Sequence, residues 1–123
     1  MNSALRVVTA DTRGRTTALA LTGELDLNTA PLLYSTVKNA LGTHRTAILD
    51  MPGVTFCDSS GLNTLIRLHH QAQDAGSRLI LAAPPRQMLR LLTITGVRGI
   101  LPVYGSLAEA WQAHPAHGAP PVH

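Results

Sequence analysis

Hydrophobic and polar residues alternate in two stretches near the start of the chain, residues 5–9 and 17–22. Alternation with a period of two is typical of β-strands that bury one face. The polar stretch between them, residues 11–15, has the composition of a turn. We therefore expect an antiparallel hairpin that Gly23 ends.

From about residue 28 the apolar positions follow a helical period instead. Asn28 or Thr29 can cap the first helix and Gly42 can end it. The sequence predicts a second helix from about Ser59 to Gly76. A third helix carries the apolar stripe of Met88, Leu91 and Leu92, and a fourth, capped by Ser106, carries Leu107, Ala110 and Trp111. We expect the stripe on the third helix to face the core rather than to form a partner groove.

Short continuous apolar runs at residues 47–49 and 79–82 indicate strands buried on both faces. Residues 51–57 are expected to form a loop. A last strand at residues 100–103 contains Pro102, which favours an edge position. Alternating strands and helices predict an α/β fold, a small single-domain mixed β-sheet with an N-terminal hairpin, then parallel strands and about four helices.

The length of 123 residues suits one domain, which we place at residues 1–113. Residues 114–123 are rich in Pro, Gly, Ala and His and are expected to be a disordered tail. Cys57 is the sole cysteine, which excludes a disulfide framework and a cysteine-rich zinc site. We expect no metal and no cofactor. No apolar run reaches the roughly 20 residues of a membrane span, and no signal layout is present, so a cytoplasmic location without a membrane partner is expected.

The net charge is +3, and the arginines stand singly along the chain. A nucleic-acid partner is disfavoured because there is no dense basic run and no interleaved aromatic residue. The basic balance fits an acidic protein partner or plain solubility.

The segment Asp58-Ser59-Ser60-Gly61 joins a buried strand to the start of the second helix. Asp58 or Ser59 is expected to be the N-cap. Gly61 is a poor helix former, so its place in the first turn indicates a close approach to its backbone. A phosphate on Ser59 would lie at the positive end of the helix dipole and beside the like charge of Asp58. On these four residues alone, a helix cap without a further role is the favoured explanation.

Two sequence elements carry a family resemblance. Gly23-Glu24-Leu25-Asp26 follows a strand, and Asp58-Ser59-Ser60-Gly61-Leu62 opens a helix, with Gly96-Val97 late in the chain. Over residues 7–111 the chain resembles the STAS domain and, more narrowly, the bacterial anti-sigma factor antagonists. The resemblance implies a STAS-like sheet with helices on one side and a protein without enzymatic activity.

By that resemblance the partner is an anti-sigma factor with serine kinase activity. It is bound by the unphosphorylated chain and released when Ser59 is phosphorylated, and a phosphatase resets phospho-Ser59. The cycle controls sigma-factor-dependent transcription. Asp58 presents Ser59, and Ser60 is a second candidate acceptor. The implied partner-binding residues are Glu24, Asp26, Asp58, Ser60, Gly61 and Asn63.

Two features depart from that family. The chain is basic where members tend to be acidic, and Cys57 stands where a larger apolar residue is common. Cysteine packs as a small hydrophobe, and no basic neighbour in sequence indicates an activated thiolate.

The same residues leave other functions open. One alternative is a STAS scaffold or adaptor subunit of a signalling or transporter complex that releases no sigma factor, and another is a small-ligand binding domain. Hydrolysis is disfavoured because Cys57–Gly61 lacks a Gly-x-Ser-x-Gly elbow and no histidine has an evident role as base. His69 falls on the apolar stripe of the second helix, which indicates a buried core or interface residue rather than a metal ligand.

Overall fold

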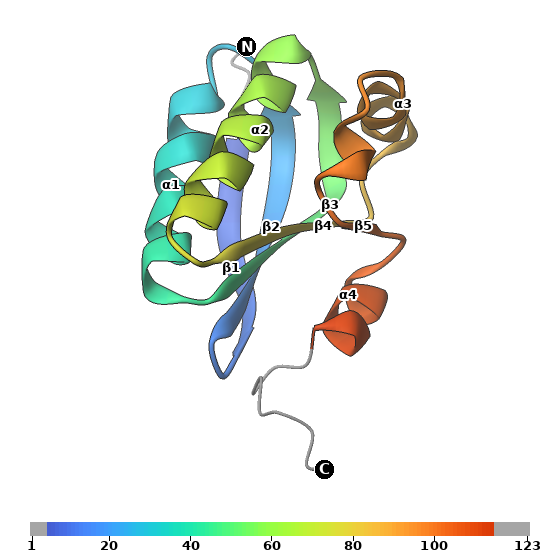
Figure 1. Ribbon diagram of the computed structural model, residues 1–123. Coiled ribbons are helices and arrows are strands. Elements are labelled where there is room, and N and C mark those ends of the chain that lie inside the picture. Colours follow the sequence, from blue (N-terminus) through green and yellow to red (C-terminus); the bar gives the residue numbers. More distant parts are fainter. Residues whose placement is uncertain (1–4, 115–123) are drawn as a thin grey trace.

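The computed structural model describes residues 5–114. It contains one five-stranded sheet in the order β1-β2-β3-β4-β5, in which β1 and β2 are antiparallel and the other neighbours are parallel. The strands are β1 (Leu5–Arg13), β2 (Thr16–Leu25), β3 (Thr46–Cys57), β4 (Arg78–Ala82) and β5 (Val103–Tyr104). The predicted mixed sheet with an N-terminal hairpin is confirmed (Figure 1).

Within residues 5–114, four α-helices and one 3₁₀ turn surround the sheet. They are α1 (Ala30–Thr43), α2 (Ser59–Asp74), α3 (Arg86–Ile94), η1 (Val97–Gly99) and α4 (Leu107–Ala113). Figure 1 shows α1 and α2 side by side over one face of the sheet, with α3 beside the C-terminal part of β3. Leu33, Leu65 and Leu92 bring these three helices into one hydrophobic cluster with the sheet.

The opposite face of the sheet has its own smaller cluster, covered by α4. Ile48 and Ile80 point away from α1 and α2 and pack with Ala110 and Trp111. This corrects the expectation of helices on one side. Alternate residues of a buried strand point to opposite faces, so the isoleucines need a second cover.

The predicted loop at residues 51–57 is wrong, because β3 continues as a strand to Cys57. β2 likewise passes Gly23 and ends at Leu25, so the two strands pair to their ends. Beyond Asp50, β3 pairs with β2 alone. Pro52 therefore lies where the strand has one partner, a position in which a missing backbone donor is tolerated.

The last strand is shorter than predicted. It holds Val103 and Tyr104, while Ile100 to Pro102 form the connection that leads into it. Its edge position is confirmed by the strand order. Pro102 has no N–H, but its carbonyl oxygen accepts a hydrogen bond from the Leu81 N–H over 3.0 Å.

Most of the predicted core residues on the helices are confirmed, while Leu91 and Leu107 are half-buried and pack against the core. Met88 and Leu92 are fully buried, so the stripe on α3 faces the core, and His69 on α2 is 8% exposed. No helix among the described residues is long and apolar enough to cross a membrane. Of the predicted tail, His114 alone is described, and its ring bonds to the Tyr104 hydroxyl over 3.0 Å. Residues 115–123 lie outside the described part of the chain.

Candidate functional site

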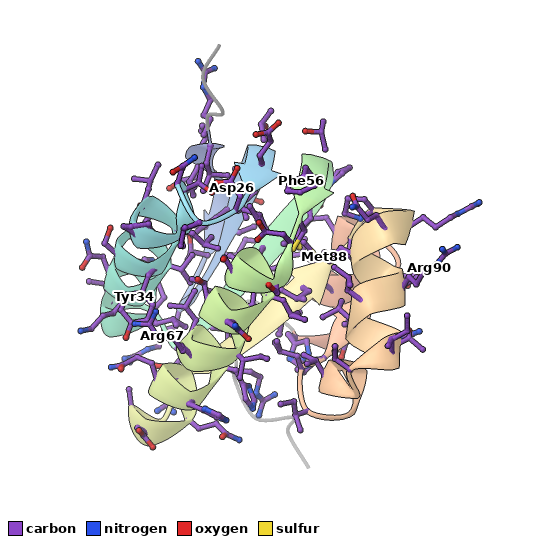
Figure 2. All side chains as sticks on the ribbon, turned by 90° about the horizontal axis from the view of Figure 1, so that it is seen from above. Asp26, Tyr34, Phe56, Arg67, Met88 and Arg90 are labelled. Atoms are coloured by element: carbon purple, nitrogen blue, oxygen red, sulfur yellow. The ribbon has the colours of Figure 1, made fainter. Side chains whose placement is uncertain are left out.

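The candidate site lies where β2 and β3 reach their carboxyl ends. Leu25 and Cys57 are partners in the parallel register, so Asp26 and Asp58 leave the sheet from neighbouring strands. The Asp58 N–H donates a hydrogen bond to the Leu25 carbonyl oxygen over 3.1 Å. Figure 2 looks onto this end of the sheet and shows Asp26 and Phe56 near each other above β2 and β3. In an open α/β sheet this edge is where binding sites gather.

Asp58 is the N-cap of α2. Its Oδ1 accepts hydrogen bonds from the backbone N–H groups of Ser60, at 2.9 Å, and Gly61, at 3.1 Å. Its backbone is extended, as an N-cap requires, and its carbonyl oxygen accepts the first helical bond from Leu62. Of the two caps that the sequence allowed, Asp58 is the one used, which leaves Ser59 as the first helical residue.

Gly61 marks the closest approach between α2 and the sheet. A Cβ at this position would lie 2.6 Å from the Leu25 carbonyl oxygen and 2.7 Å from the Leu25 Cβ. The sequence predicted a close approach to this glycine, and the group that approaches it is the end of β2. Gly61 is itself buried. Its contact with Leu25 therefore sets how closely the first turn of α2, which contains Ser59 and Ser60, packs on the sheet.

Asp26 shapes the turn between β2 and α1. Its Oδ1 accepts hydrogen bonds from the N–H groups of Asn28 and Thr29, and its own N–H donates to Thr29 Oγ1 over 3.0 Å. Thr29 Oγ1 in turn donates to the Glu24 carbonyl oxygen over 2.7 Å. Because the Asp26 carboxylate and Thr29 bind each other's backbone, the turn holds Asp26 at a fixed place beside Asp58.

The hydroxyl-bearing residues of the site differ in exposure. Ser59 is exposed, and among residues 5–114 no side chain or backbone group hydrogen-bonds to its Oγ. Ser60 is half-buried, and its carbonyl oxygen accepts a bond from Thr64 Oγ1. Asn63 is exposed four residues after Ser59, one turn further along the same helix face. Ser59 is therefore the more accessible hydroxyl.

Cys57 packs beneath the site as an apolar residue. It is 2% exposed and its Sγ lies 3.5 Å from the Asp58 carbonyl oxygen. Burial, together with the nearby Asp58 charge, raises the pKa of the Cys57 thiol to about 11. The thiol is thus protonated at neutral pH and is not an activated nucleophile, in agreement with the sequence analysis.

Sequence reasoning missed two apolar residues at the site, Leu27 and Phe56. Leu27 is 73% exposed in the turn after β2, and Phe56 is 40% exposed and pairs with Glu24 in the register. Phe56 follows a register shift in the β2–β3 pairing, which falls between Gly23 and Glu24. Leu27 stands in a polar turn outside any periodic stripe, and that isolation was the available signal. We call Leu27 and Phe56 the apolar rim of the site.

The site is acidic. Glu24, Asp26 and Asp58 supply three of the seven carboxylate side chains of the chain. The ion pair found among residues 5–114 joins Arg13 to Asp11 elsewhere, so no described cation neutralises these three. No described group of three His, Cys, Asp or Glu side chains could hold a metal ion.

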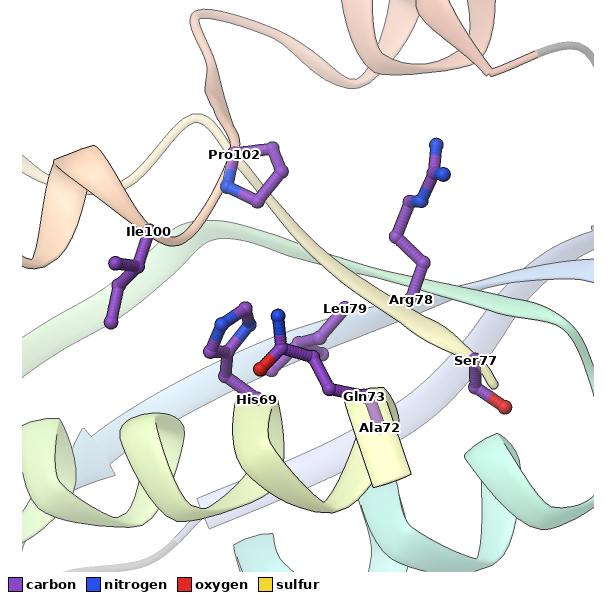
Figure 3. Close-up of a pocket in the computed structure, with 8 residues that line it drawn as sticks. All are labelled: His69, Ala72, Gln73, Ser77, Arg78, Leu79, Ile100 and Pro102. Carbon is purple, nitrogen blue, oxygen red and sulfur yellow. The ribbon is translucent and has the colours of Figure 1, made fainter. Parts of the chain in front are cut away.

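A separate pocket of about 340 Å³ opens between the C-terminal half of α2 and the start of β4. Figure 3 shows His69 and Gln73 pointing from α2 into this space, below Pro102, while Arg78 extends outward. Burial and the charge of His70 lower the pKa of His69, so its ring is neutral at pH 7. The pocket holds no chain of catalytic groups, and it lies toward the other end of α2 from Ser59.

Comparison with known proteins identifies this arrangement. The family model of the STAS domain matches residues 7–110. The chain belongs to the STAS domain family. Both sequence elements of the site, residues 23–26 and 58–62, fall inside the match, and the predicted family is confirmed.

Solved structures share this STAS fold at low sequence identity. A crystal structure of an anti-sigma factor antagonist from Mycobacterium paratuberculosis has a TM-score of 0.79 and 22% identity, over 89% of this chain and 93% of that one. The Bacillus cell fate determinant SpoIIAA in its phosphorylated form has a TM-score of 0.67 and 21% identity, over 89% and 98%. SLC26A9 has a TM-score of 0.72 and 22% identity, over 85% of this chain and 21% of that one. The same fold thus occurs both as a whole small protein and as part of a much larger one.

Proposed function

We propose that this STAS domain is an anti-sigma factor antagonist that switches partners and that Ser59 is its phosphorylation site. The observation that carries the proposal is the position of Ser59, exposed and without a hydrogen-bond partner among the described residues, directly after a rigid Asp58 cap. The likeness to phosphorylated SpoIIAA supports it, since that protein carries a phosphate on the same fold.

The capping geometry explains why a phosphate here would act on a partner. A phosphoserine adds roughly −1.5 to −2 charges and three acceptor oxygens. The nearest helix donors, the N–H groups of Ser60 and Gly61, are already taken by Asp58. These N–H groups are therefore not free to bind the phosphate oxygens. The new negative charge stays exposed on the surface that carries Glu24, Asp26 and Asp58.

The apolar rim supplies attraction in the unphosphorylated form. Leu27 follows Asp26 in the chain and Phe56 pairs with Glu24 in the sheet, and both are exposed. An apolar partner surface that covers them would gain about 25 cal/mol for each Å² removed from water. Covering a doubly charged phosphate at the same place requires its desolvation, which costs several kcal/mol unless cations pair with it. Phosphorylation is thus expected to release the partner without refolding the domain.

The cycle assigns all chemistry to partners. A kinase transfers the γ-phosphoryl group of ATP to Ser59 Oγ and releases ADP, and a phosphatase hydrolyses the phosphoserine. The chain itself is proposed to have no catalytic role and to need no cofactor. We place the exchange in the cytoplasm, where ATP is available to the kinase. The unphosphorylated chain sequesters the anti-sigma factor and so frees a sigma factor for transcription. The proposed contact surface consists of Glu24, Asp26, Asp58, Ser60 and Asn63. Gly61, which the sequence also suggested as a contact, is buried against Leu25 and supports this surface from below.

Incubation with candidate anti-sigma factor kinases and ATP tests the site assignment. Intact-mass spectrometry is expected to show addition of one phosphate, lost in Ser59→Ala and kept in the neighbouring control Ser60→Ala. Phosphate in the Ser59→Ala variant, or loss of phosphate in Ser60→Ala alone, would show that Ser59 is not the phosphorylated residue. No modification by any such kinase would contradict the proposal.

A second candidate function is suggested by two further structures. This domain shares its fold with SLC26A9 and with a sulfate transporter family protein from Wolinella succinogenes. In that case the domain is an adaptor in a transporter or signalling assembly and Ser59 is a helix residue without a switching role. Co-purification separates the two functions. A stable complex whose affinity is the same for the wild type and Ser59→Asp favours the adaptor.

A further inference from the structure

The outer side of α3 carries a charge pattern unlike the rest of the molecule. Residues 75–108 contain no Asp or Glu, although they include four of the nine arginines. Three of these, Arg86, Arg90 and Arg98, are exposed and line one pocket of about 270 Å³. Three of the ten lysine and arginine side chains therefore lie together on this surface.

The spacing places these residues on one helix face. Arg86, Arg90 and Ile94 stand at i, i+4 and i+8, and Leu89 and Thr93 lie between them on the same side. Figure 2 shows Arg90 on the side of α3 that faces away from α2, whereas Met88 points inward. We call Arg86, Leu89, Arg90, Ile94 and Arg98 the arginine face.

The arginine face is not arranged to stabilise the helix. Arg86 stands in the first turn of α3, where the helix dipole is positive and where no acidic residue compensates. Arg86 and Arg90 also repel each other at i, i+4. Nothing in residues 5–114 forms an ion pair with any of them. An external anionic group would relieve both of these unfavourable arrangements.

An apolar residue lies within the same face. Ile94 is 73% exposed and, with Leu89, borders the pocket that the arginines line. A central apolar contact with a charged rim is typical of a protein interface. A nucleic-acid groove would instead call for stacking aromatics, and the face has none.

We propose that the arginine face is a second docking site, which binds an acidic segment of a protein partner that carries one apolar anchor residue. The carboxylates of the partner segment pair with Arg86, Arg90 and Arg98. The apolar anchor residue of the segment packs against Ile94 and Leu89. This site does not include Ser59, and it holds whether or not the proposed phosphorylation takes place. It explains why a member of this family is basic: the excess charge serves one partner contact.

A defined peptide tests the site. The probe is a fluorescein-labelled, Ala-rich peptide of about 14 residues, with Glu at i, i+4 spacing around one central Leu, which is long enough to form a marginal helix. Fluorescence anisotropy is expected to give a Kd below about 1 mM, and the Kd is expected to rise at high salt. Amide chemical shifts of the labelled chain are expected to move at residues 86–98. A peptide with Gln for Glu, or with Ala for the central Leu, is expected to bind more weakly.

Matched charge variants decide the location. The triple variant R86Q/R90Q/R98Q is expected to bind the peptide about tenfold more weakly. The control R15Q/R45Q/R78Q removes three charges at the opposite end of the sheet, where Arg15 and Arg45 precede β2 and β3 and Arg78 begins β4. It is expected to leave the affinity unchanged. Circular dichroism verifies that both variants fold. Arg98 lies in η1 and not on α3. The single variant Ile94→Ser therefore repeats the test on α3 itself, without any change of charge.

Four outcomes would overturn the proposal. They are no binding at 1 mM peptide, equal loss in both triple variants, shifts outside the arginine face, and tighter binding to a DNA duplex or to phosphatidylglycerol vesicles than to the peptide. None of these measurements uses Ser59, so failure here is distinct from failure of the proposed function.

Discussion

The Asp58 N–H and the Leu25 carbonyl oxygen are joined by a hydrogen bond of 3.1 Å, which ties the end of β3 to the end of β2. Leu25 also lies beneath Gly61, so one residue of β2 fixes both the cap and the first turn of α2. Ser59 lies between these two attachments. Its exposure therefore follows from the packing of its neighbours and does not depend on any contact of its own.

The first prediction concerns the space at Gly61. Gly61→Ala is expected to destabilise the domain by about 1–3 kcal/mol, because its Cβ would overlap the Leu25 backbone, which cannot move freely. Gly42→Ala is the control. Gly42 has open space around it in the last turn of α1, and the substitution is expected to stabilise by about 0.5 kcal/mol. Urea unfolding measures both. Equal effects would show that the contact with Leu25 is not tight.

The second prediction separates the cap from the charge of Asp58. Asp58→Ala removes the acceptor for Ser60 and Gly61 and is expected to cost about 1 kcal/mol, whereas Asp58→Asn keeps an acceptor and is expected to cost little. Asp74→Ala, at the other end of α2, changes the charge equally without touching a cap. A loss of stability in Asp74→Ala as large as that in Asp58→Ala would argue against the capping role.

The third prediction uses Cys57. The pKa of its thiol is raised from 9.0 to about 11 in the folded protein, first by burial and then by the Asp58 charge. The unfolded chain then loses its proton first, so stability is expected to fall as pH rises from about 9 to 11. Cys57→Ala is expected to remove this part of the pH dependence. Native Cys57 is also expected to react slowly with a disulfide reagent at pH 8 and rapidly after unfolding. Fast reaction of the native protein would contradict its burial.

The fourth prediction concerns His69. Burial and the charge of His70 lower its pKa in the folded state, so the unfolded chain binds the proton more readily. Its contribution to stability is present above the ordinary pKa of about 6.5 and is lost as pH falls below it. His69→Gln is expected to flatten the acid limb of stability in part, since the pKa of His114 is lowered too, by burial and by Arg78. His70→Gln, at an exposed position, is expected to retain most of the acid dependence. An unchanged acid limb in His69→Gln would show that the ring is solvated.

Much of this fold followed from local patterns. The hairpin, the two buried strands and the core stripe on α3 were predictable because period and burial coincide there. The strand at residues 51–57 was not, since Pro52 and Gly53 signal a loop unless it is known that β3 has lost its second partner at that point. The second core under α4 depended on tertiary packing of Ile48 and Ile80.

The candidate site divided in the same way. Asp58 and Ser59 were found from the cap pattern and the family resemblance, because both are encoded in consecutive residues. Leu27 and Phe56 were missed, because their exposure depends on how a turn and a strand end are placed in space. The arginine face was hidden for a related reason. Arginines that stand singly along the sequence meet once the helix turns them to one side.

The affinity of the purified domain for its anti-sigma factor kinase, measured by calorimetry before and after phosphorylation of Ser59, tests the central claim most directly. Tight binding of the unphosphorylated form and at least about 100-fold weaker binding of the phosphorylated form are expected, since covering a doubly charged phosphate at an interface without pairing cations costs several kcal/mol. Ser59→Asp is also expected to lower the affinity for the kinase, and Ser60→Asp is expected to lower it less. Equal affinity of the phosphorylated and unphosphorylated forms would contradict the switch at Ser59.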